Sequence, residues 1–547
     1  MVTNSYSHTA KFIKSGAEVI VGYNDGAIEL RKTPGLELVK RLSGHSQPVI
    51  GLALSPDEKF LVSVGEDNVV TVWNLENFQS YSRISRDDEW AIYTSDGYFD
   101  ASPHGGDLLA IVDGLNVYPV EQFATERNRP DLILERMGLG TSELLGYYQS
   151  LYQKRLNNLG GAGAATGAGL DAPEGKITGV TRQGEFVTVD FELSGGKSQL
   201  KRCLIYVNDT PIFGKLGKAI SGKYYKGSEK LELSAGKNKI EVSGVNEAGA
   251  ESYRALTYAE SKGRKGGELY YLAFGVSKYK DPALSLNYAD KDAKDLEEVI
   301  RKLSPRYDRV HVKTLLNSEV TATSISAAKE FLKDSKTRDT VVLFLAGHGG
   351  YDKGEAPRYY FLPYEADSAD LKATGVDFDT IESLLNDIQA RKKLFLLDTC
   401  DSGELDEATF ASYYTMAVSR GIKPRTYRKP LKGRGQARAK VRDYLYKKDR
   451  FIYNKLSKRS GAVVFSSSRG GEMSYESSAI KNGFFTKEIM KAFTDKLADK
   501  NDDKRISTNE LKEYVSHAVA ANTGELQHPS VDRDNLFQGV DFPSLAY

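Results

Sequence analysis

The chain has 547 residues and nearly balanced charge, with 75 Lys and Arg against 74 Asp and Glu. A hydrophobic fraction of 40% and a charged fraction of 27% are typical of globular proteins and exclude a disordered or collagen-like chain. At roughly 100–200 residues per domain, this length predicts several domains. The two cysteines, Cys203 and Cys400, exclude a disulfide scaffold and favour the reducing cytoplasm.

No apolar run approaches the ~20 residues that a membrane helix needs. Residues 1–16 lack the apolar core of a secretion signal, so we expect no cleaved signal. The near-zero net charge argues against a general nucleic-acid binder. We therefore expect neither a membrane nor a nucleic acid among the partners. One segment departs from this average, because residues 421–460 contain 15 Lys or Arg and 2 Asp.

Two β-rich stretches lie in residues 8–80. The second opens with Gly-His at 44–45, continues through short alternating strands and ends with Trp-Asn at 73–74. This order is typical of a blade of a WD-type β-propeller. The side chains expected to form the hydrogen-bond network of this blade are His45, Ser63, Asp67 and Trp73. We expect about two blades in residues 1–84, fewer than the ~4–8 that close a propeller.

The next three segments differ in composition. Residues 85–157 mix β and helical patterns and are predicted to form a connector, and residues 158–171 form a Gly/Ala-rich linker. Residues 172–260 contain short alternating runs with turn signals about every ten residues, as in an immunoglobulin-like sandwich. Cys203 lies in one of these runs, where we expect a small buried hydrophobic residue.

From residue 266 to 547 the pattern changes to alternating strands and helices. The strands ELYYLAFG, DTVVLFLAG and KKLFLLD are almost continuously apolar, and the predicted helix at 288–303 has one apolar face. Such strands indicate a mostly parallel sheet that helices cover on both faces.

Two of these strands end in residues that can do chemistry. His348 follows VVLFLAG and Cys400 follows KKLFLLDT, and active sites of open α/β sheets form at the carboxyl ends of strands. A cysteine beside a histidine suits nucleophilic catalysis. The N–H groups of Gly349 and Cys400 would then stabilise an oxyanion, at about 2.7–4 kcal/mol per donor. The alternative is a buried structural cysteine and a histidine in a turn.

Seven segments carry a family resemblance: AFGVSKY (273–279), NYADKDAKDL (287–296), LAGHGG (345–350), RYYFLP (358–363), LDTCDSG (397–403), VVFSSSRGGEMSYE (463–476) and NGFFTKEI (482–489). Together they resemble the caspase-like cysteine peptidases, especially the bacterial orthocaspases and the related metacaspases. The resemblance implies Cys400 as nucleophile and His348 as general base. The expected fold class is therefore multidomain, with WD-like repeats and an immunoglobulin-like sandwich before an α/β caspase-like domain.

Specificity is implied by two acidic positions. Asp292 and Asp398 match residues that line the primary pocket of metacaspases and select Arg or Lys, whereas animal caspases carry Gln at the first position and select Asp. A desolvated carboxylate pair favours a guanidinium, which it can bind through two hydrogen bonds. The alternative for Asp292 is a solvated carboxylate at a helix start. Ser466 is a third predicted substrate-binding residue.

The basic segment 421–460 lies where caspase-like enzymes carry their interdomain linker. An enzyme that prefers Arg or Lys would cut such a linker, so we predict a zymogen that processes itself there. The candidate cleavage sites are Arg434, Arg438, Arg442 and Arg450. The alternative is a solvated basic loop that contacts nucleic acid or acidic partners.

A weaker pattern at residues 499–510 follows the spacing of a calcium-binding EF loop. The candidate ligands are Asp499, Asn501, Asp503 and Glu510. Lys504 replaces the glycine that normally makes the sharp turn at position 6. The alternative is a polar loop in which Ser507 or Thr508 caps the next helix. We therefore expect no required metal or cofactor, with calcium as a minor candidate.

The sequence thus predicts a cytoplasmic cysteine endopeptidase that hydrolyses peptide bonds after Arg or Lys. Its partners would be protein or peptide substrates, with a regulatory protein at the N-terminal modules. Two other functions stay open. One is an inactive scaffold with a caspase fold, and the other is a nucleic-acid-associated factor that uses residues 421–460.

Overall fold

The computed structural model divides into two compact units, one formed by the described residues up to 156 and the other by those from 172 onward. The described residues are 6–87, 89–102, 105–113, 115–138, 145–146, 148–149, 152–153, 156, 172–214, 216–262, 266–351, 358–399, 414–426, 460–468, 472–532 and 541–546. None of the described helices has both the length and the hydrophobicity to cross a membrane.

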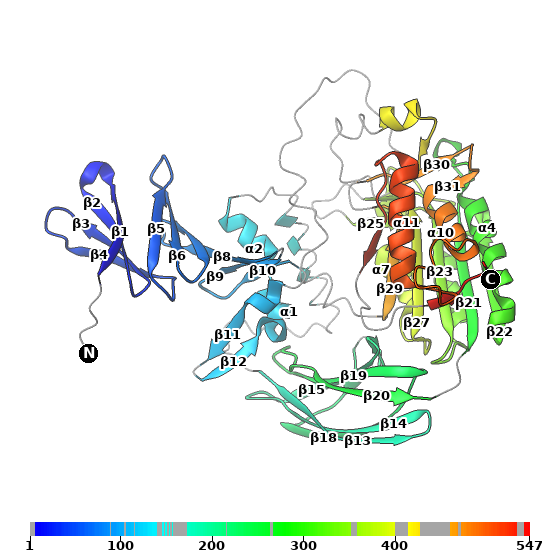
Figure 1. The fold of residues 1–547 in the computed structure, drawn as a ribbon, viewed down its shortest axis with the longest axis horizontal. Helices are drawn as coiled ribbons and strands as arrows, with labels where there is room; N and C mark the ends of the chain where they lie inside the picture. Colours follow the sequence, from blue (N-terminus) through cyan, green and yellow to red (C-terminus); the bar gives the residue numbers. More distant parts are fainter. Residues whose placement is uncertain are drawn as a thin grey trace. The chain divides into compact units, whose positions relative to one another are not determined.

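The first unit begins with two antiparallel sheets (Figure 1). The first sheet contains β1 (Ser7–Ile13), β2 (Glu18–Tyr23), β3 (Ala27–Lys32) and β4 (Leu38–Ser43). The second sheet contains β5 (Val49–Leu54), β6 (Phe60–Gly65), β7 (Val69–Asn74), β8 (Ser80–Arg86), β9 (Glu89–Thr94) and β10 (Phe99–Ala101). Ile20 and Ile28 of the first sheet share one buried core with Leu61 and Trp73 of the second. The second sheet extends past residue 84, because β8 forms a further antiparallel pair with β9.

The predicted hydrogen-bond network of the second sheet is confirmed. Nε2 of His45 lies 2.8 Å from Oγ of Ser63, and Nε1 of Trp73 donates to the same oxygen at 2.9 Å. Nδ1 of His45 lies 3.1 Å from a carboxylate oxygen of Asp67. Further elements of this unit are β11 (Ala110–Asp113), β12 (Asn116–Pro119), α1 (Ala124–Arg127) and α2 (Pro130–Arg136).

Two antiparallel sheets then form a sandwich. One contains β13 (Glu174–Gln183), β14 (Phe186–Ser194) and β18 (Tyr224–Glu232), and the other contains β15 (Leu200–Val207), β16 (Thr210–Pro211), β17 (Lys218–Ala219), β19 (Gly236–Asn246) and β20 (Ala255–Ser261). Phe191 of one sheet and Ile205 and Val242 of the other lie in a common core. Cys203 is fully buried in this core, and burial raises the pKa of its thiol to about 12. The prediction of a small, buried hydrophobic residue at Cys203 is confirmed.

A six-stranded sheet organises the α/β domain, in the order β22-β21-β23-β27-β29-β33. Its strands are β21 (Glu268–Gly275), β22 (Arg309–Leu316), β23 (Thr340–Gly347), β27 (Lys392–Thr399), β29 (Ala462–Ser466) and β33 (Ser530–Asp532). All neighbouring pairs are parallel except β29 with β33, which is antiparallel. The mostly parallel sheet that the apolar strands predicted is confirmed.

Helices cover both faces of this sheet (Figure 1). On β21, Tyr271 and Ala273 belong to one core, while Leu272 and Phe274 belong to the other, since successive side chains of a strand point to opposite faces. The first core includes α4 (Ala289–Lys302), α10 (Phe484–Thr494) and α11 (Thr508–Thr523). The second includes α5 (Ala322–Ala327), α6 (Leu371–Thr374) and α7 (Phe378–Glu382).

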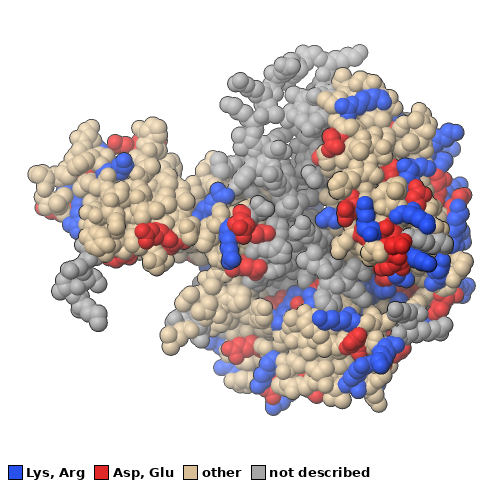
Figure 2. All heavy atoms as spheres, in the orientation of Figure 1, with Lys and Arg blue, Asp and Glu red and all other residues tan. Residues whose placement is uncertain are grey.

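Short sheets accompany the central sheet. They are β24 (Gly349–Tyr351), β25 (Tyr359–Phe361) and β26 (Val376–Asp377); β28 (Lys423–Pro424), β30 (Tyr475–Ser477) and β31 (Asn482–Gly483); and β32 (Arg505–Ser507) with β34 (Asp541–Pro543). The 3-10 helices are η1 (Lys14–Gly16), η2 (Gly105–Leu108), η3 (Val120–Phe123), η4 (Pro282–Leu284), η5 (Ser304–Arg306), η6 (Asn317–Glu319), η7 (Ala328–Leu332) and η8 (Ser383–Leu385). On the face drawn in Figure 2, acidic and basic side chains of the α/β domain are interspersed.

Candidate active site

The two predicted catalytic residues follow paired positions of neighbouring strands. Gly347, the last residue of β23, is the parallel partner of Thr399, the last residue of β27. His348 directly follows Gly347, and Cys400 directly follows Thr399. Adjacent strands lie about 4.8 Å apart, so Gly347 and Thr399 lie at the same edge of the sheet. Cys400 itself lies outside the described residues.

His348 is held in place through its backbone and its ring. Its side chain is buried, and its N–H donates to the Tyr279 hydroxyl at 2.8 Å. Nε2 lies 2.7 Å from the carbonyl oxygen of Leu284, which can only accept a hydrogen bond. This contact is shorter than the 3.3 Å contact of Nδ1 with the carbonyl oxygen of Arg425, which also only accepts, so we assign the proton of the neutral ring to Nε2 and the lone pair to Nδ1. Burial lowers the pKa of His348 to about 4, so the ring is neutral near pH 7.

Nδ1 of His348 faces a backbone carbonyl from a distant part of the chain. It lies 3.3 Å from the carbonyl oxygen of Arg425, which is 77 residues away in the sequence. Nδ1, the nitrogen that can act as a base, therefore lies beside the carbonyl group of an arginine residue.

Glycine is required at position 349 by a close contact. A Cβ atom on Gly349 would lie 2.1 Å from the hydroxyl oxygen of Tyr359. That hydroxyl is hydrogen-bonded to Oγ1 of Thr399, the residue before Cys400. Gly349 therefore lets Tyr359 reach the end of β27.

The carbonyl of Thr399 is fixed from the other side by two buried serines. Oγ of Ser467 donates to it at 3.1 Å and Oγ of Ser474 at 2.9 Å. The backbone of Thr399 is therefore held by side chains that come from the loop after β29.

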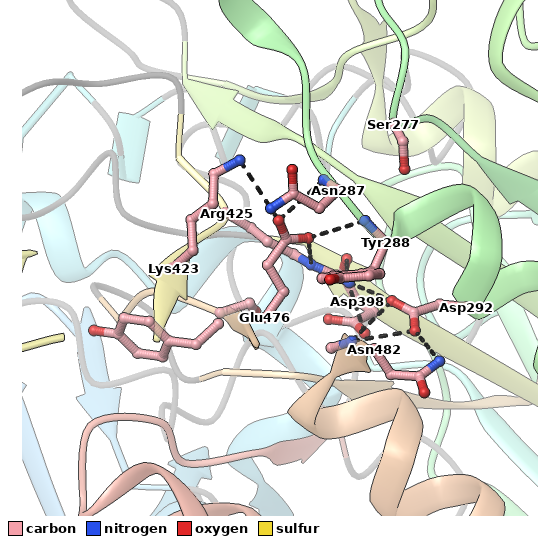
Figure 3. A network of polar contacts seen from close by, with 12 residues as sticks. Ser277, Asn287, Tyr288, Asp292, Asp398, Lys423, Arg425, Glu476 and Asn482 are labelled. Carbon is pink, nitrogen blue, oxygen red and sulfur yellow. Dashed lines mark hydrogen bonds and ion pairs between the residues drawn. The ribbon is translucent and has the colours of Figure 1, made fainter. Parts of the chain in front are cut away.

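Three buried carboxylates, Asp292, Asp398 and Glu476, surround the guanidinium of Arg425; we call them the carboxylate cluster (Figure 3). Nη2 of Arg425 is paired with Asp292, Nη1 lies 3.0 Å from Oδ2 of Asp398, and Nε lies 3.4 Å from Oε2 of Glu476. All four side chains have an exposed fraction of 0%. This burial excludes the alternative of a solvated carboxylate at position 292.

Neighbouring donors hold the carboxylates in position. Asp292 accepts hydrogen bonds from the Gly483 amide at 3.1 Å and from Nδ2 of Asn482 at 2.8 Å. Oγ1 of Thr486 donates to Asp398. Glu476 accepts from the backbone N–H groups of Asn287, at 3.0 Å, and Tyr288, at 3.3 Å (Figure 3).

The charges of the cluster depend on one another. Burial raises the pKa of Asp292, the Arg425 charge lowers it, and the Asp398 charge raises it further. Burial disfavours the charged form of Arg425, but the three carboxylates raise its pKa well above the ordinary value. The cluster is therefore a site for a buried cation, and it is built to hold a guanidinium.

Comparison with known families agrees with this geometry. The caspase domain family matches residues 270–540, and the WD domain, G-beta repeat family matches residues 36–74. Residues 270–540 form a caspase-family domain. An N-terminal WD-repeat region precedes this caspase domain.

Individual relatives match short parts of the chain. WD repeat-containing protein 55 of Arabidopsis thaliana is 33% identical over 67 residues, 12% of this chain and 19% of that protein. Protein HIR1 of Phaeosphaeria nodorum is 32% identical over 80 residues, 15% of this chain and 8% of that protein. The chain thus spans less than a fifth of the length of either relative. Crystallised RRP9 WD40 repeats and the structure of U3-55K each give a TM-score of 0.14 at 14% identity, covering 19% of this chain and 36% and 37% of those chains.

Sequence reasoning identified part of the caspase domain's polar site. It chose Asp292 and Asp398, which the structure brings together, but it missed Glu476. Glu476 is the last residue of the segment VVFSSSRGGEMSYE that carries the resemblance, so a signal was present. Arg425 was counted in the basic segment but was not singled out.

Other predicted site residues stay untested. Ser466 ends β29 and is the strand partner of Leu397 and Ser530, whereas the side chains that donate to the Thr399 carbonyl are those of Ser467 and Ser474. The oxyanion roles of Gly349 and Cys400 stay predictions. The candidate cleavage sites Arg434, Arg438, Arg442 and Arg450 lie outside the described residues.

The predicted calcium ligands of the caspase domain have other partners. Asp499 accepts hydrogen bonds from the backbone N–H groups of Asp503 and Lys504, at 3.2 and 2.9 Å. Lys504 makes the turn at position 6 with a φ of 64°. Ser507 caps α11 and forms a reciprocal capping box with Glu510, as the alternative expected. In the described part of the chain, no three His, Cys, Asp or Glu side chains are grouped to hold a metal. Calcium binding stays a prediction.

Proposed function

We propose that the caspase domain is a cysteine endopeptidase that hydrolyses peptide bonds after Arg or Lys, with Cys400 as nucleophile and His348 as general base. One observation carries this proposal. An arginine side chain fills the carboxylate cluster while its own carbonyl oxygen lies 3.3 Å from Nδ1 of His348. A substrate arginine held in the same way would present its scissile carbonyl to the catalytic residues.

The proposed reaction uses the lone pair on Nδ1. His348 takes the thiol proton of Cys400, and the thiolate attacks the carbonyl carbon after the arginine. His348 then gives the proton to the leaving amine, and water hydrolyses the thioester. The Leu284 carbonyl supports these steps because its hydrogen bond with Nε2 fixes the tautomer and the orientation of the ring. The N–H groups of Gly349 and Cys400 would bind the oxyanion.

The cluster also supports an order of preference among substrates. Each of the three nitrogens of the Arg425 guanidinium faces a different carboxylate. A lysine offers one nitrogen to the same three groups, so we expect Arg to be preferred over Lys. An aspartate would place a fourth negative charge in a buried site, so cleavage after Asp is not expected.

The proposal also includes how the peptidase activity is regulated. We propose that the chain is a zymogen that processes itself in the basic segment 421–460. The WD-repeat region and the sandwich would recruit protein substrates or a regulatory protein partner. A reducing compartment such as the cytoplasm would keep Cys400 as a thiol.

Hydrolysis of fluorogenic peptides ending in Arg, Lys or Asp tests the proposal. We expect cleavage after Arg and, more slowly, after Lys, with none after Asp, and complete loss in a Cys400→Ala variant. Cys203→Ala is the matched control, because Cys203 lies in the sandwich core, and it should retain the activity. Parallel assays with calcium and with a chelator test the EF-like loop. Cleavage after Asp would remove the proposed roles of Asp292 and Asp398.

The second candidate is an inactive scaffold with a caspase fold. The observation that favours it is the same buried Arg425, which occupies the place of a substrate side chain in the uncut protein. A scaffold would hydrolyse none of these peptides, and its Cys400→Ala variant would behave as the wild type in every assay.

A further inference from the structure

A short segment of the chain lies against the caspase domain in the manner of a bound peptide. Strand β28 pairs antiparallel with β30, with Lys423 opposite Glu476 and Pro424 opposite Tyr475. The pairing continues for one residue, because the Arg425 amide donates to the Ser474 carbonyl at 2.8 Å. Addition of a strand to a sheet edge is a common mode of peptide recognition, in which main-chain hydrogen bonds fix the register.

The register of this strand places three groups at once. The Arg425 side chain enters the carboxylate cluster, its carbonyl oxygen lies 3.3 Å from Nδ1 of His348, and Thr426 follows on the far side of that peptide bond. Ser474, which accepts from the Arg425 amide, also holds the Thr399 carbonyl through its hydroxyl. The strand and the residue before Cys400 are therefore positioned by the same residue, the strand through the Ser474 backbone and Thr399 through the Ser474 side chain.

We propose that the bond between Arg425 and Thr426 is the self-cleavage site of this chain, and that residues 423–425 block the active site until the bond is cut. This inference rests on the proposed function. It differs from the expectation drawn from the sequence, which placed the cut at Arg434, Arg438, Arg442 or Arg450. The bond is cut in cis, since the segment already occupies the site within a single chain.

The cut follows the chemistry proposed for other substrates. The Cys400 thiolate forms a bond with the carbonyl carbon of Arg425, after Nδ1 of His348 has taken the thiol proton. The C–N bond to Thr426 breaks, and His348 passes that proton to the Thr426 nitrogen, which becomes a new amino terminus. Water then adds to the thioester, Cys400 regains a proton, and Arg425 ends in a carboxylate.

Residues 423–425 block the active site because the Arg425 side chain is buried in the carboxylate cluster and is tethered to the rest of the chain. Arg425 is fully buried and neutralises part of the charge of three buried carboxylates. A competing peptide would have to displace a cation that the chain supplies at the high effective concentration of a tethered group. After the cut, residues 423–425 are a free chain end, which can leave the site and admit another peptide.

The strand also predicts the sequence that the open site prefers. Lys423, two residues before Arg425, lies with its Nζ 3.7 Å from Oε1 of Glu476 (Figure 3). A peptide ending in Lys-Pro-Arg reproduces these contacts, so it is the appropriate probe for the cut enzyme.

The test uses the purified full-length chain and three variants. Wild type should yield a new amino terminus at Thr426, identified by terminal sequencing and intact mass. Arg425→Gln should abolish this terminus, and Arg425→Lys, which keeps the cation, should retain it at a reduced rate. Arg434→Gln is the matched control in the same basic segment, and it should give the Thr426 terminus at the wild-type rate. The rate should not change over a 100-fold range of protein concentration, because the reaction is intramolecular.

Hydrolysis of the Lys-Pro-Arg peptide is measured in the same samples. In the wild type it should begin after a lag and rise in proportion to the fraction cut at Arg425. Hydrolysis without a lag, together with a self-cleavage pattern that Arg425→Gln leaves unchanged, would overturn the inference and leave the peptidase function intact. Absence of both self-cleavage and peptide hydrolysis in every variant would overturn the proposed function as well.

Discussion

Glu476 offers the sharpest test of how the carboxylate cluster recognises an arginine side chain. Its Oε2 atom lies 3.4 Å from Nε of Arg425, a nitrogen that a lysine side chain does not have. Replacing Glu476 with Gln keeps the shape and one acceptor oxygen but removes the charge. The variant should therefore weaken recognition of Arg more than recognition of Lys.

The expected size follows from the distance and the burial. At 3.4 Å and an effective dielectric constant near 20, the attraction between the two charges is about 5 kcal/mol. Much of this is offset, because the neutral Gln is easier to bury and no longer repels Asp292 and Asp398. A hydrogen bond to a charged group is worth about 1.5–3 kcal/mol net. That range corresponds to a loss of roughly 10- to 150-fold in kcat/KM for Arg peptides.

The assay compares two fluorogenic peptides that differ only in Arg or Lys at the last position. Alanine replaces the lysine two residues earlier, so that its contact with Glu476 does not contribute. The enzyme is the fully processed form. Glu472→Gln is the matched control, because Glu472 lies four residues away, in the loop before β30, and is paired with His528. It should leave both values of kcat/KM within about twofold of the wild type.

A fall in the ratio of Arg to Lys cleavage supports the geometry. Equal losses for the two peptides would mean that Glu476 acts through general charge or folding, and the assignment of Glu476 to Nε would be wrong. An unchanged kcat/KM for Arg would show that a substrate arginine does not take the position of Arg425.

Two further predictions concern acid–base behaviour and the WD-repeat region. Burial raises the pKa of Asp292, and only the ionised carboxylate attracts a guanidinium. KM for Arg peptides should therefore rise as the pH falls. The rise should begin at a pH well above the ordinary pKa of aspartate, which is near 4. Asp292→Asn should remove this dependence, and a KM that stays flat between pH 5 and 8 in the wild type would contradict it. Ser63→Ala should destabilise the first unit by about 1–3 kcal/mol, because Nε1 of Trp73 loses its buried acceptor. Denaturant unfolding followed by tryptophan fluorescence measures this loss of stability, since both tryptophans, Trp73 and Trp90, belong to that unit. Ser85→Ala, at an exposed position, is the control. An equal effect of the two changes would refute the stabilising role of the hydrogen-bond network around Ser63.

Much of the α/β domain could be predicted from local patterns. Near-continuous apolar strands indicated a parallel sheet, and the sequence placed His348 and Cys400 directly after two of them. The pairing of Gly347 with Thr399 then brings the carboxyl ends of those two strands to one edge of the sheet. The network of Ser63 and Trp73 was predictable for the same reason, because its members lie within one blade and recur with a fixed spacing.

The occupant of the carboxylate cluster was decided by the tertiary structure alone. Arg425 is one of 15 Lys and Arg in the segment 421–460, and nothing in its local sequence marks it. It is 133 residues from Asp292 and 51 from Glu476, and the pairing of β28 with β30 selects it. Composition shows that a segment is basic, but which of its cations becomes buried depends on hydrogen bonds and charges contributed by distant parts of the chain.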